Sequence, residues 1–151
     1  MKVAELCRHS VVTIRPSDEL TTAAALMRER HVGYLVVVEP VSVDGSLRPA
    51  GILTDRDIVV SVIARQTDAA SLRVGEVMTQ NPVVVGDSES VEEAVSSMRR
   101  VGVRRLPVVG SRGQLVGVIS IDDVLDALAG QLMNVAGSIR NERTIEGALR
   151  P

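Results

Sequence analysis

Apolar and polar positions follow the same order twice along the chain. Residues 11–14 form a short β-branched stretch that predicts a strand, and apolar positions at helical spacing predict a helix after it. Two further apolar runs of strand length, residues 34–39 and 50–54, precede a second predicted helix from Asp55 to about Ala64. The order strand, helix, strand, strand, helix then recurs, which indicates a repeated unit.

The two copies align residue by residue. The segment that starts at Val3 reappears from Val74, 71 residues later, and "GILTDRDIVV" from Gly51 reappears as "GVISIDDVLD" from Gly117, 66 residues later. The first copy therefore carries five extra residues in its 41–50 loop. These offsets divide the chain into repeat 1 (residues 3–64), a linker (65–73), repeat 2 (74–129) and a tail (130–151).

The first helix of each copy has a cap signal. Ser17 and Ser88 are predicted N-caps, and Asp18 and Glu19 suit the positive end of the helix dipole in the first turn. The central strand runs do not alternate with polar residues, so both faces of each sheet should be covered. We expect helices on one face and the partner copy on the other.

The tail contains one further apolar stripe. Leu128, Leu132, Val135 and Ile139 share one side of a predicted helix that Gly130 interrupts. This helix either packs on the body of its own subunit or takes part in dimerisation, and the sequence leaves both alternatives open.

Composition and charge exclude several classes of protein. The chain has 151 residues, no Phe, no Trp and one Tyr, Tyr34, so a bound base would lie against aliphatic side chains. A net charge of −2 argues against binding of nucleic acid or membranes through bulk electrostatics, although a local basic patch stays open. The single cysteine, Cys7, fits a reducing compartment, and no apolar run has the length of a membrane span. We expect a soluble, cytoplasmic protein.

Several signatures occur in the same order in both copies, including "VGEVMTQNPVVV", "VRRLPVV" and "GVISIDDVL". With this order of strands and helices, the chain resembles a tandem pair of cystathionine β-synthase (CBS) domains, a Bateman module, from Val3 to about Ala129. The resemblance implies a mixed α/β (α+β) fold in which two three-stranded sheets pack face to face with helices outside, related by a pseudo-two-fold axis. It also implies a disc-shaped homodimer.

The resemblance implies a regulatory ligand rather than an obligatory cofactor. Members of the family bind adenosine compounds such as AMP, ADP, ATP or S-adenosylmethionine between their repeats, here with or without Mg²⁺, and report on them to an enzyme or transporter. No such domain is attached here, so we expect a stand-alone module that acts on a separate, unknown regulated protein.

Two hydroxyl and carboxylate pairs are the first candidate ligand sites. Thr54 with Asp57, and Ser120 with Asp123, each begin a predicted helix at a spacing that approximates a capping box. By resemblance, the Asp binds the ribose hydroxyls and the Ser or Thr contacts phosphate or ribose. A carboxylate accepts hydrogen bonds from both sugar hydroxyls, so ligand binding and capping are compatible.

Arg104 and Arg105 are the candidate phosphate ligands, because guanidinium groups donate paired hydrogen bonds to phosphate. The aligned residues of the first copy are Gly33 and Tyr34, so we expect one stronger nucleotide site and one weak, empty or selective for a less charged ligand. A solvated pair of arginines is the alternative.

The first strands supply the candidate adenine-binding residues. By resemblance these are Val12, Ile14, Val83 and Val85, although plain core strand is an equally good reading. Arg56 and Asp122 are expected to be solvated, and His31 to have a capping or surface role. Cys7 and His9 alone do not make a zinc site, so no metal ligand is assigned.

No motif for catalysis is present, and we do not expect an enzyme. The leading hypothesis is a regulatory sensor of adenine nucleotide. The alternatives are a ligand-free scaffold that dimerises through its repeats, and an oligonucleotide-binding module with a patch at Arg99, Arg100, Arg104 and Arg105.

Overall fold

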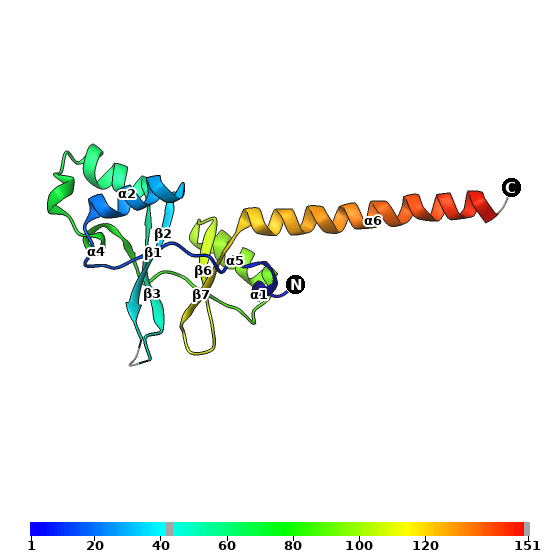
Figure 1. Cartoon of the computed structure of the whole chain (residues 1–151), viewed down its shortest axis with the longest axis horizontal. Helices are drawn as coiled ribbons and strands as arrows, with labels where there is room; N and C mark the ends of the chain where they lie inside the picture. The colour runs from blue at the N-terminus through cyan, green and yellow to red at the C-terminus, as the bar shows by residue number, and fades with distance from the viewer. Residues whose placement is uncertain (42–43, 150–151) are drawn as a thin grey trace.

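Each copy of the repeated pattern folds into its own sheet with helices against it, as the computed structural model of the chain shows (Figure 1). The structure describes residues 1–41 and 44–149. Residues 42 and 43 of the predicted 41–50 loop, and residues 150 and 151 of the predicted tail, lie outside the described residues.

The first sheet has the order β1-β2-β3-β4. Its strands are β1 (Thr13–Ile14), β2 (Tyr34–Pro40), β3 (Leu47–Thr54) and β4 (Thr79–Gln80). Strand β1 runs parallel to β2, and β2, β3 and β4 are successively antiparallel. The second sheet, β5 (Val85–Gly86), β6 (Arg105–Val109) and β7 (Leu115–Ser120), repeats the pattern of β1, β2 and β3.

The expectation of two three-stranded sheets is therefore wrong for the first sheet, which gains β4 from the second copy. Thr79 pairs with Ile52 and Gln80 with Gly51. At the equivalent place in the second sheet the pairing is a single bridge between Arg8 and Val118. Strand β3 also starts three residues before the predicted Ala50.

The first helix of each repeat starts later than predicted. Helices α2 (Leu20–Arg30) and α5 (Val91–Val101) have Glu19 and Ser90 as N-caps, so the assignment of Ser17 and Ser88 was wrong. The physical reason is pairing with a distant segment, because Glu19 and Ser90 each form an isolated antiparallel bridge that keeps the backbone extended, to Arg73 and Lys2 respectively.

The buried residues of each sheet divide between its two faces. In β2, Leu35 and Val37 point into a core beneath α2, whereas the equally buried Val36 and Val38 alternate onto the opposite face. The second core lies beneath α5 and includes Leu106 and Val108 of β6. The burial of both faces of β2 agrees with the prediction from its unbroken apolar run.

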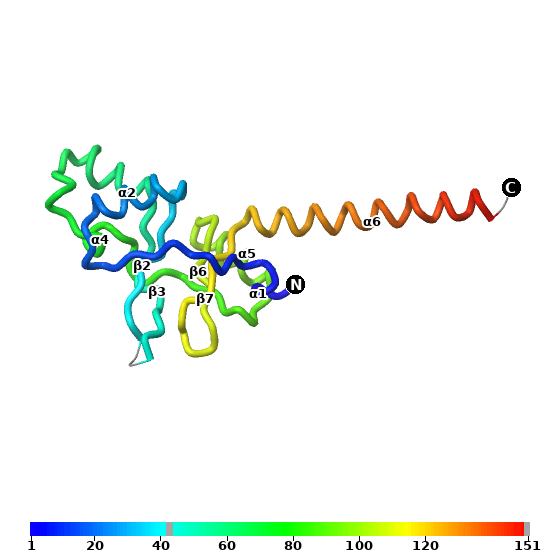
Figure 2. The backbone as a smooth tube through the Cα atoms, in the orientation of Figure 1, coloured from blue at the N-terminus to red at the C-terminus, as the bar shows by residue number. Residues whose placement is uncertain are grey.

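The two repeats exchange the segments that precede their first strands. Helix α1 (Val3–Leu6) packs in the core of the second repeat, and α4 (Val74–Val77) packs in the core of the first. Figure 2 shows the blue N-terminal segment starting beside α5 and crossing to the first sheet. Backbone hydrogen bonds from Val3 to Glu89 (3.0 Å) and from Val74 to Asp18 (2.9 Å) hold the exchanged segments in place.

The second helix of each repeat differs in length. Helix α3 (Asp55–Ile58) continues as a π-helix, η1 (Val59–Ala64), which ends where predicted, and a short 3₁₀ turn, η2 (Ala69–Ser71), lies in the linker. The second repeat ends in one unbroken helix, α6 (Ile121–Leu149), so the predicted interruption at Gly130 is wrong. A glycine inside a helix costs only about 1 kcal/mol relative to Ala.

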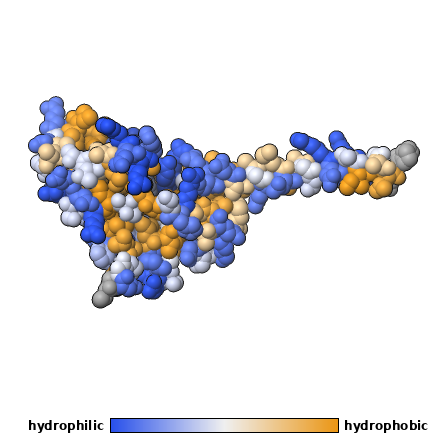
Figure 3. All heavy atoms as spheres, in the orientation of Figure 1, coloured by the Kyte–Doolittle hydropathy of each residue, from blue (hydrophilic) through white to orange (hydrophobic). Residues whose placement is uncertain are grey.

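Helix α6 leaves the body of the molecule and projects away from both sheets (Figure 1). Val124 is buried, but the large apolar residues beyond it, from Leu125 to Leu149, are exposed. Figure 3 shows apolar atoms on the projecting part of the helix. Within residues 1–41 and 44–149, the alternative that the stripe packs on its own subunit is therefore wrong. The same residues include no helix that is both long and apolar enough to cross a membrane.

Candidate functional site

A cavity of about 630 Å³ lies where the two repeats meet, which is within the usual size range of sites for small molecules. The first repeat contributes the end of β3, the start of α3 and the start of β2. The second repeat contributes the C-terminal end of α5, the start of β6, and residues Thr79, Asn81, Pro82 and Val83. The predicted site residues on its wall are Thr54, Asp57, Arg104, Arg105 and Val83.

Thr54 and Asp57 form a complete capping box at the start of α3. The Asp57 N–H donates to Thr54 Oγ1 (3.2 Å), and the Thr54 N–H donates to Asp57 Oδ2 (2.8 Å). The prediction of capping is confirmed. Within the described part of the chain, Asp57 Oδ1 has no hydrogen-bond partner, so one carboxylate oxygen on the cavity wall is available for a ligand hydroxyl.

Arg104 and Arg105 face the same cavity as Thr54 and Asp57, although they come from the other repeat. The Arg104 guanidinium pairs with Asp122 (Nη2 to Oδ1, 2.9 Å), and both side chains are more than half exposed. Arg105 lies over the ring of Tyr34, with the guanidinium carbon 5.8 Å from the ring centroid. Arg56 also lines the cavity, so its wall carries three guanidinium groups, with the carboxylates of Asp55 and Asp57 beside them.

The Tyr34 hydroxyl is buried at this wall with no hydrogen-bond partner among the described residues. Burial raises the pKa of Tyr34 far above its usual value, and the nearby charge of Arg105 offsets only part of this effect. A buried hydroxyl without a partner costs free energy, so Tyr34 lowers the stability of the wall that it helps to form.

The second hydroxyl and carboxylate pair has a different environment. Ser120 and Asp123 repeat the capping hydrogen bonds, Asp123 N–H to Ser120 Oγ (3.2 Å) and Ser120 N–H to Asp123 Oδ2 (2.9 Å). The remaining oxygen, Oδ1, accepts a hydrogen bond from Arg8 Nε at 2.7 Å. Burial opposes ionisation of Asp123, but the hydrogen bonds from Ser120 and Arg8 outweigh it and hold its pKa below the usual value.

The predicted adenine-binding residues separate into wall and core. Val83 lies on the cavity wall. Ile14 and Val85 are buried inside the first and second core, and Val12 packs against the first. Val83 precedes β5 and also packs against the second core, so it contacts both the core and the cavity.

Sequence reasoning missed two parts of the site. It did not consider Thr79, and it did not foresee that Arg8 would reach Asp123, 115 positions later in the chain. Arg56 is exposed, as predicted, and also lines the cavity. The 71-residue offset aligns Arg8 with Thr79 and was the one signal that linked these two positions. His31 lies at the exposed C-terminal end of α2 in a left-handed conformation, as its predicted capping role requires.

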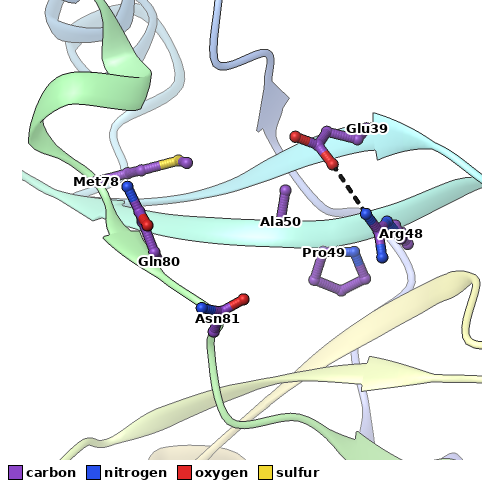
Figure 4. Close-up of a pocket in the computed structure, with 7 residues that line it drawn as sticks. All are labelled: Glu39, Arg48, Pro49, Ala50, Met78, Gln80 and Asn81. Atoms are coloured by element: carbon purple, nitrogen blue, oxygen red, sulfur yellow. Dashed lines mark hydrogen bonds and ion pairs between the residues drawn. The ribbon is translucent and has the colours of Figure 1, made fainter.

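A second, smaller hollow of about 310 Å³ lies on the first sheet near β4 (Figure 4). Glu39 and Arg48 pair at one side of it (3.2 Å), and Figure 4 shows Met78, Gln80 and Asn81 along the other side. It contains none of the predicted site residues, and its two charged groups neutralise each other. Within the described ranges, no three potential metal-ligating side chains gather at one place.

Comparison with known proteins identifies the repeat. A family model for the CBS domain matches the chain twice, at residues 3–63 and 74–130. The chain belongs to the CBS domain family. Its two repeats form a CBS pair, and the mixed α/β fold with two sheets is that of other such pairs. The uncharacterized protein MK0525 of Methanopyrus kandleri is 32% identical over 125 residues, which are 83% of this chain and 61% of that protein.

Solved structures show the same fold with adenosine compounds. The CBS domain protein PAE2072 of Pyrobaculum aerophilum, complexed with AMP, is 27% identical, with a TM-score of 0.71 over 82% of this chain and 89% of that one. The CBS domain pair of protein MJ0100, in complex with 5-methylthioadenosine and S-adenosyl-L-methionine, has a TM-score of 0.72. It is 20% identical, over 87% of this chain and 98% of that one, and supports the fold alone.

Proposed function

We propose that this CBS pair is a regulatory module that binds an adenine nucleotide in the 630 Å³ cavity between its repeats. One observation carries the proposal: a ribose-type carboxylate, Asp57, and phosphate-type guanidinium groups, Arg104 and Arg105, line the same cavity. The AMP complex of PAE2072 supports the same class of ligand. AMP, ADP, ATP and S-adenosylmethionine are the candidates.

Each group of the ligand has a matching part of the wall. Asp57 Oδ1 accepts hydrogen bonds from the ribose hydroxyls, while Thr54 stays engaged with the start of α3. Arg104 and Arg105 bind the phosphate. Arg104 gives up its exposed ion pair with Asp122 when it does so. The base lies against aliphatic residues such as Val83 and Val103.

Regulation requires that the ligand bind two conformations with different affinity. The cavity wall is divided between the repeats, so a ligand that bridges them favours one relative arrangement. A homodimer of the pair passes this change to a separate regulated protein, and the module itself carries out no catalysis.

The test is thermal unfolding of the purified protein with AMP, ADP, ATP or S-adenosylmethionine, with and without Mg²⁺, followed by calorimetry. A ligand at about 100 times its dissociation constant stabilises a single site by about 2.7 kcal/mol, which raises the midpoint by several degrees. Asp57→Asn should abolish that shift and leave the ligand-free midpoint within a few degrees of the wild type. No shift with any compound would refute the sensor and favour the ligand-free scaffold.

The environment of the arginines opposes the oligonucleotide alternative. Arg100 shares a surface hollow with Glu89, Glu92 and Glu93, whereas Arg104 and Arg105 line the cavity. The basic residues therefore do not form one continuous patch that a nucleic-acid backbone would follow.

A further inference from the structure

The two repeats place different residues against equivalent carboxylates. Thr79 pairs in antiparallel register with Ile52 and lines the same cavity as Asp57, whereas Arg8 pairs in the same way with Val118 and contacts Asp123. Arg8 and Thr79 align at the 71-residue offset, as Val118 and Ile52 do at the 66-residue offset. Each is delivered by the segment that the repeats exchange, so Arg8 and Thr79 occupy the same structural position.

The side chain at this position determines whether the carboxylate is open. Thr79 is short, and within the described part of the chain the neighbouring Asp57 Oδ1 has no hydrogen-bond partner. The Arg8 Nε donates to Asp123 Oδ1 at 2.7 Å, while Oδ2 accepts from Ser120. The side chain of Asp123 is 9% exposed, so Arg8 both neutralises the carboxylate and covers it.

The backbone holds Arg8 at this place. Its N–H donates to Val118 O (2.8 Å), and the Val118 N–H donates back to Arg8 O (2.9 Å). His9 Nδ1 lies 2.9 Å from Val116 O, so Arg8 and the residue after it are both anchored to β7. The ion pair is therefore formed by an ordered segment rather than by a loose N-terminus.

We infer that the chain has one open and one self-occupied ligand site, and that the difference between Thr79 and Arg8 decides which is which. This inference rests on the proposed function. An adenine nucleotide binds at Asp57, and the guanidinium of Arg8 takes the place of the ribose hydroxyls at Asp123. The two CBS repeats of one chain then bind one ligand, although the chain contains two copies of the binding motif.

Exchange of the two residues tests the inference. Calorimetry with AMP should give one site per wild-type chain, and Thr79→Arg should weaken binding at least tenfold, whereas the matched control Thr79→Ser should change it less than threefold. In ¹H–¹⁵N spectra, AMP should shift the amides of residues 54–57 in the wild type. For the Arg8→Thr variant the probe is adenosine, because it carries no phosphate group that would need an arginine partner. Adenosine should shift the amides of Ser120 and Asp123 in this variant as well.

The outcomes separate the inference from the function on which it rests. Absence of binding of AMP, ADP, ATP and S-adenosylmethionine to the wild type would refute the function. Two AMP sites per wild-type chain, full binding by Thr79→Arg, or unchanged Ser120 and Asp123 amides in Arg8→Thr would each refute the inference and leave the sensor intact.

A second inference comes from α6, independently of any ligand. Leu125, Leu128, Leu132, Val135 and Ile139, which we call the seam, follow one another at alternating spacings of three and four residues. All five are between 44% and 71% exposed. This 3.5-residue period is the pattern of helices that pair in a left-handed coiled coil.

The projecting part of α6 needs a partner to stay helical. Within the described residues, the last hydrogen bond from α6 to the body runs from Gln131 Nε2 to Met1 Sδ (3.6 Å), and some 18 further helical residues follow it. Isolated helices of this length are marginal in water, and Gly130 and Gly137 weaken this one further. Packing of the seam supplies the missing stabilisation.

We propose that the seam pairs with the seam of a second copy of this chain. A second copy brings an apolar stripe of the same period and length, and pairing removes on the order of 1,000 Å² from water, which is near the lower limit for a specific interface. The side chains beside the seam, Ala129, Gln131, Ala136 and Ser138, are uncharged, so two copies approach without like-charge repulsion. The paired region ends before Glu142, the next position of the stripe, where carboxylates replace apolar groups.

Neighbouring residues of similar exposure give a matched test. Leu132 is on the seam and 71% exposed, whereas Met133 is off the seam and 76% exposed. In analytical ultracentrifugation, Leu132→Glu should halve the mass of the wild-type assembly and Met133→Glu should leave it unchanged. A monomeric wild type, or a Leu132→Glu variant that keeps the wild-type mass with an unchanged far-UV spectrum, would refute self-pairing.

Discussion

The backbone N–H of Val74 donates to the carbonyl of Asp18 at 2.9 Å, which ties the first residue of the second CBS repeat to the turn before α2 of the first. Val74 is fully buried in the first core, and its counterpart Val3 is fully buried in the second. Each repeat therefore completes its core with a segment that belongs to the sequence of the other.

Gly117→Ala should release the N-terminal segment from the second repeat. A Cβ at Gly117 would lie 2.8 Å from the carbonyl oxygen of Arg8, which is too close, and backbone cannot yield as a side chain does. Overpacking of this kind should lower the free energy of unfolding by about 1–3 kcal/mol. Urea denaturation of the variant and the wild type measures this difference. Gly137→Ala on α6, where nothing lies within 4 Å, is the matched control and should be neutral or stabilising. Equal effects of the two substitutions would contradict the prediction.

Tyr34→Phe should stabilise the ligand-free protein. The Tyr34 hydroxyl is buried and has no hydrogen-bond partner among the described residues, so its removal relieves a desolvation cost of about 1 kcal/mol. Thermal unfolding measures the change, and AMP titration shows whether the hydroxyl also contacts ligand. A lower midpoint in the ligand-free variant would contradict the prediction.

Local patterns predicted most of the elements. The repeat, the central strands and both capping boxes follow from residues close in sequence, because hydrogen bonds such as that from Asp57 N–H to Thr54 Oγ1 span only three residues. The family model confirms the CBS assignment that these patterns suggested. The ligand role of the site residues stays a prediction.

Long-range pairing explains what the sequence did not reveal. Helix α2 begins at Leu20 rather than beside Ser17 because Glu19 pairs with Arg73, and β4 joins the first sheet because Thr79 pairs with Ile52. No local periodicity marks these contacts. The same applies to Arg8, whose partner Asp123 belongs to the other repeat.

Arg8→Thr should lower stability at neutral pH but not in acid. The Ser120 and Arg8 hydrogen bonds overcome the effect of burial and keep the pKa of Asp123 below its unfolded value of about 3.9. A lowered pKa contributes stability that is present above about pH 4 and is lost as the pH falls through the folded pKa. Urea denaturation of wild type and variant should therefore differ at pH 7 and converge near pH 2. A difference independent of pH would show that Arg8 acts through packing instead.

His31→Gly should stabilise the end of α2. His31 has a φ of 55°, in the left-handed region, where the equivalent residue at the end of α5 is Gly102 with a φ of 72°. Relief of the steric cost should raise the free energy of unfolding by about 0.5–1 kcal/mol. The reciprocal change, Gly102→His, should lower the free energy of unfolding by a similar amount. Thermal unfolding of both variants measures these changes, and a stabilising effect of Gly102→His would contradict the explanation.

Cys7 should react slowly with iodoacetamide in the native protein. The thiol is 8% exposed, and burial, helped by the charge of Asp87, raises its pKa, so little thiolate is present near neutral pH. Mass spectrometry of timed samples gives the rate, and Gly117→Ala should accelerate the reaction at least tenfold. A native rate equal to that in urea would show that the N-terminal segment does not stay docked.

The crossed segments also bear on how such a chain arose. A single ancestral repeat of this design would leave the gap that Val3 or Val74 now fills in its neighbour, and only another molecule of the same kind would supply the missing piece. Gene duplication would then have joined two partners that already depended on each other. At the position that decides whether the carboxylate is covered, the two halves now differ, with Arg8 in one and Thr79 in the other.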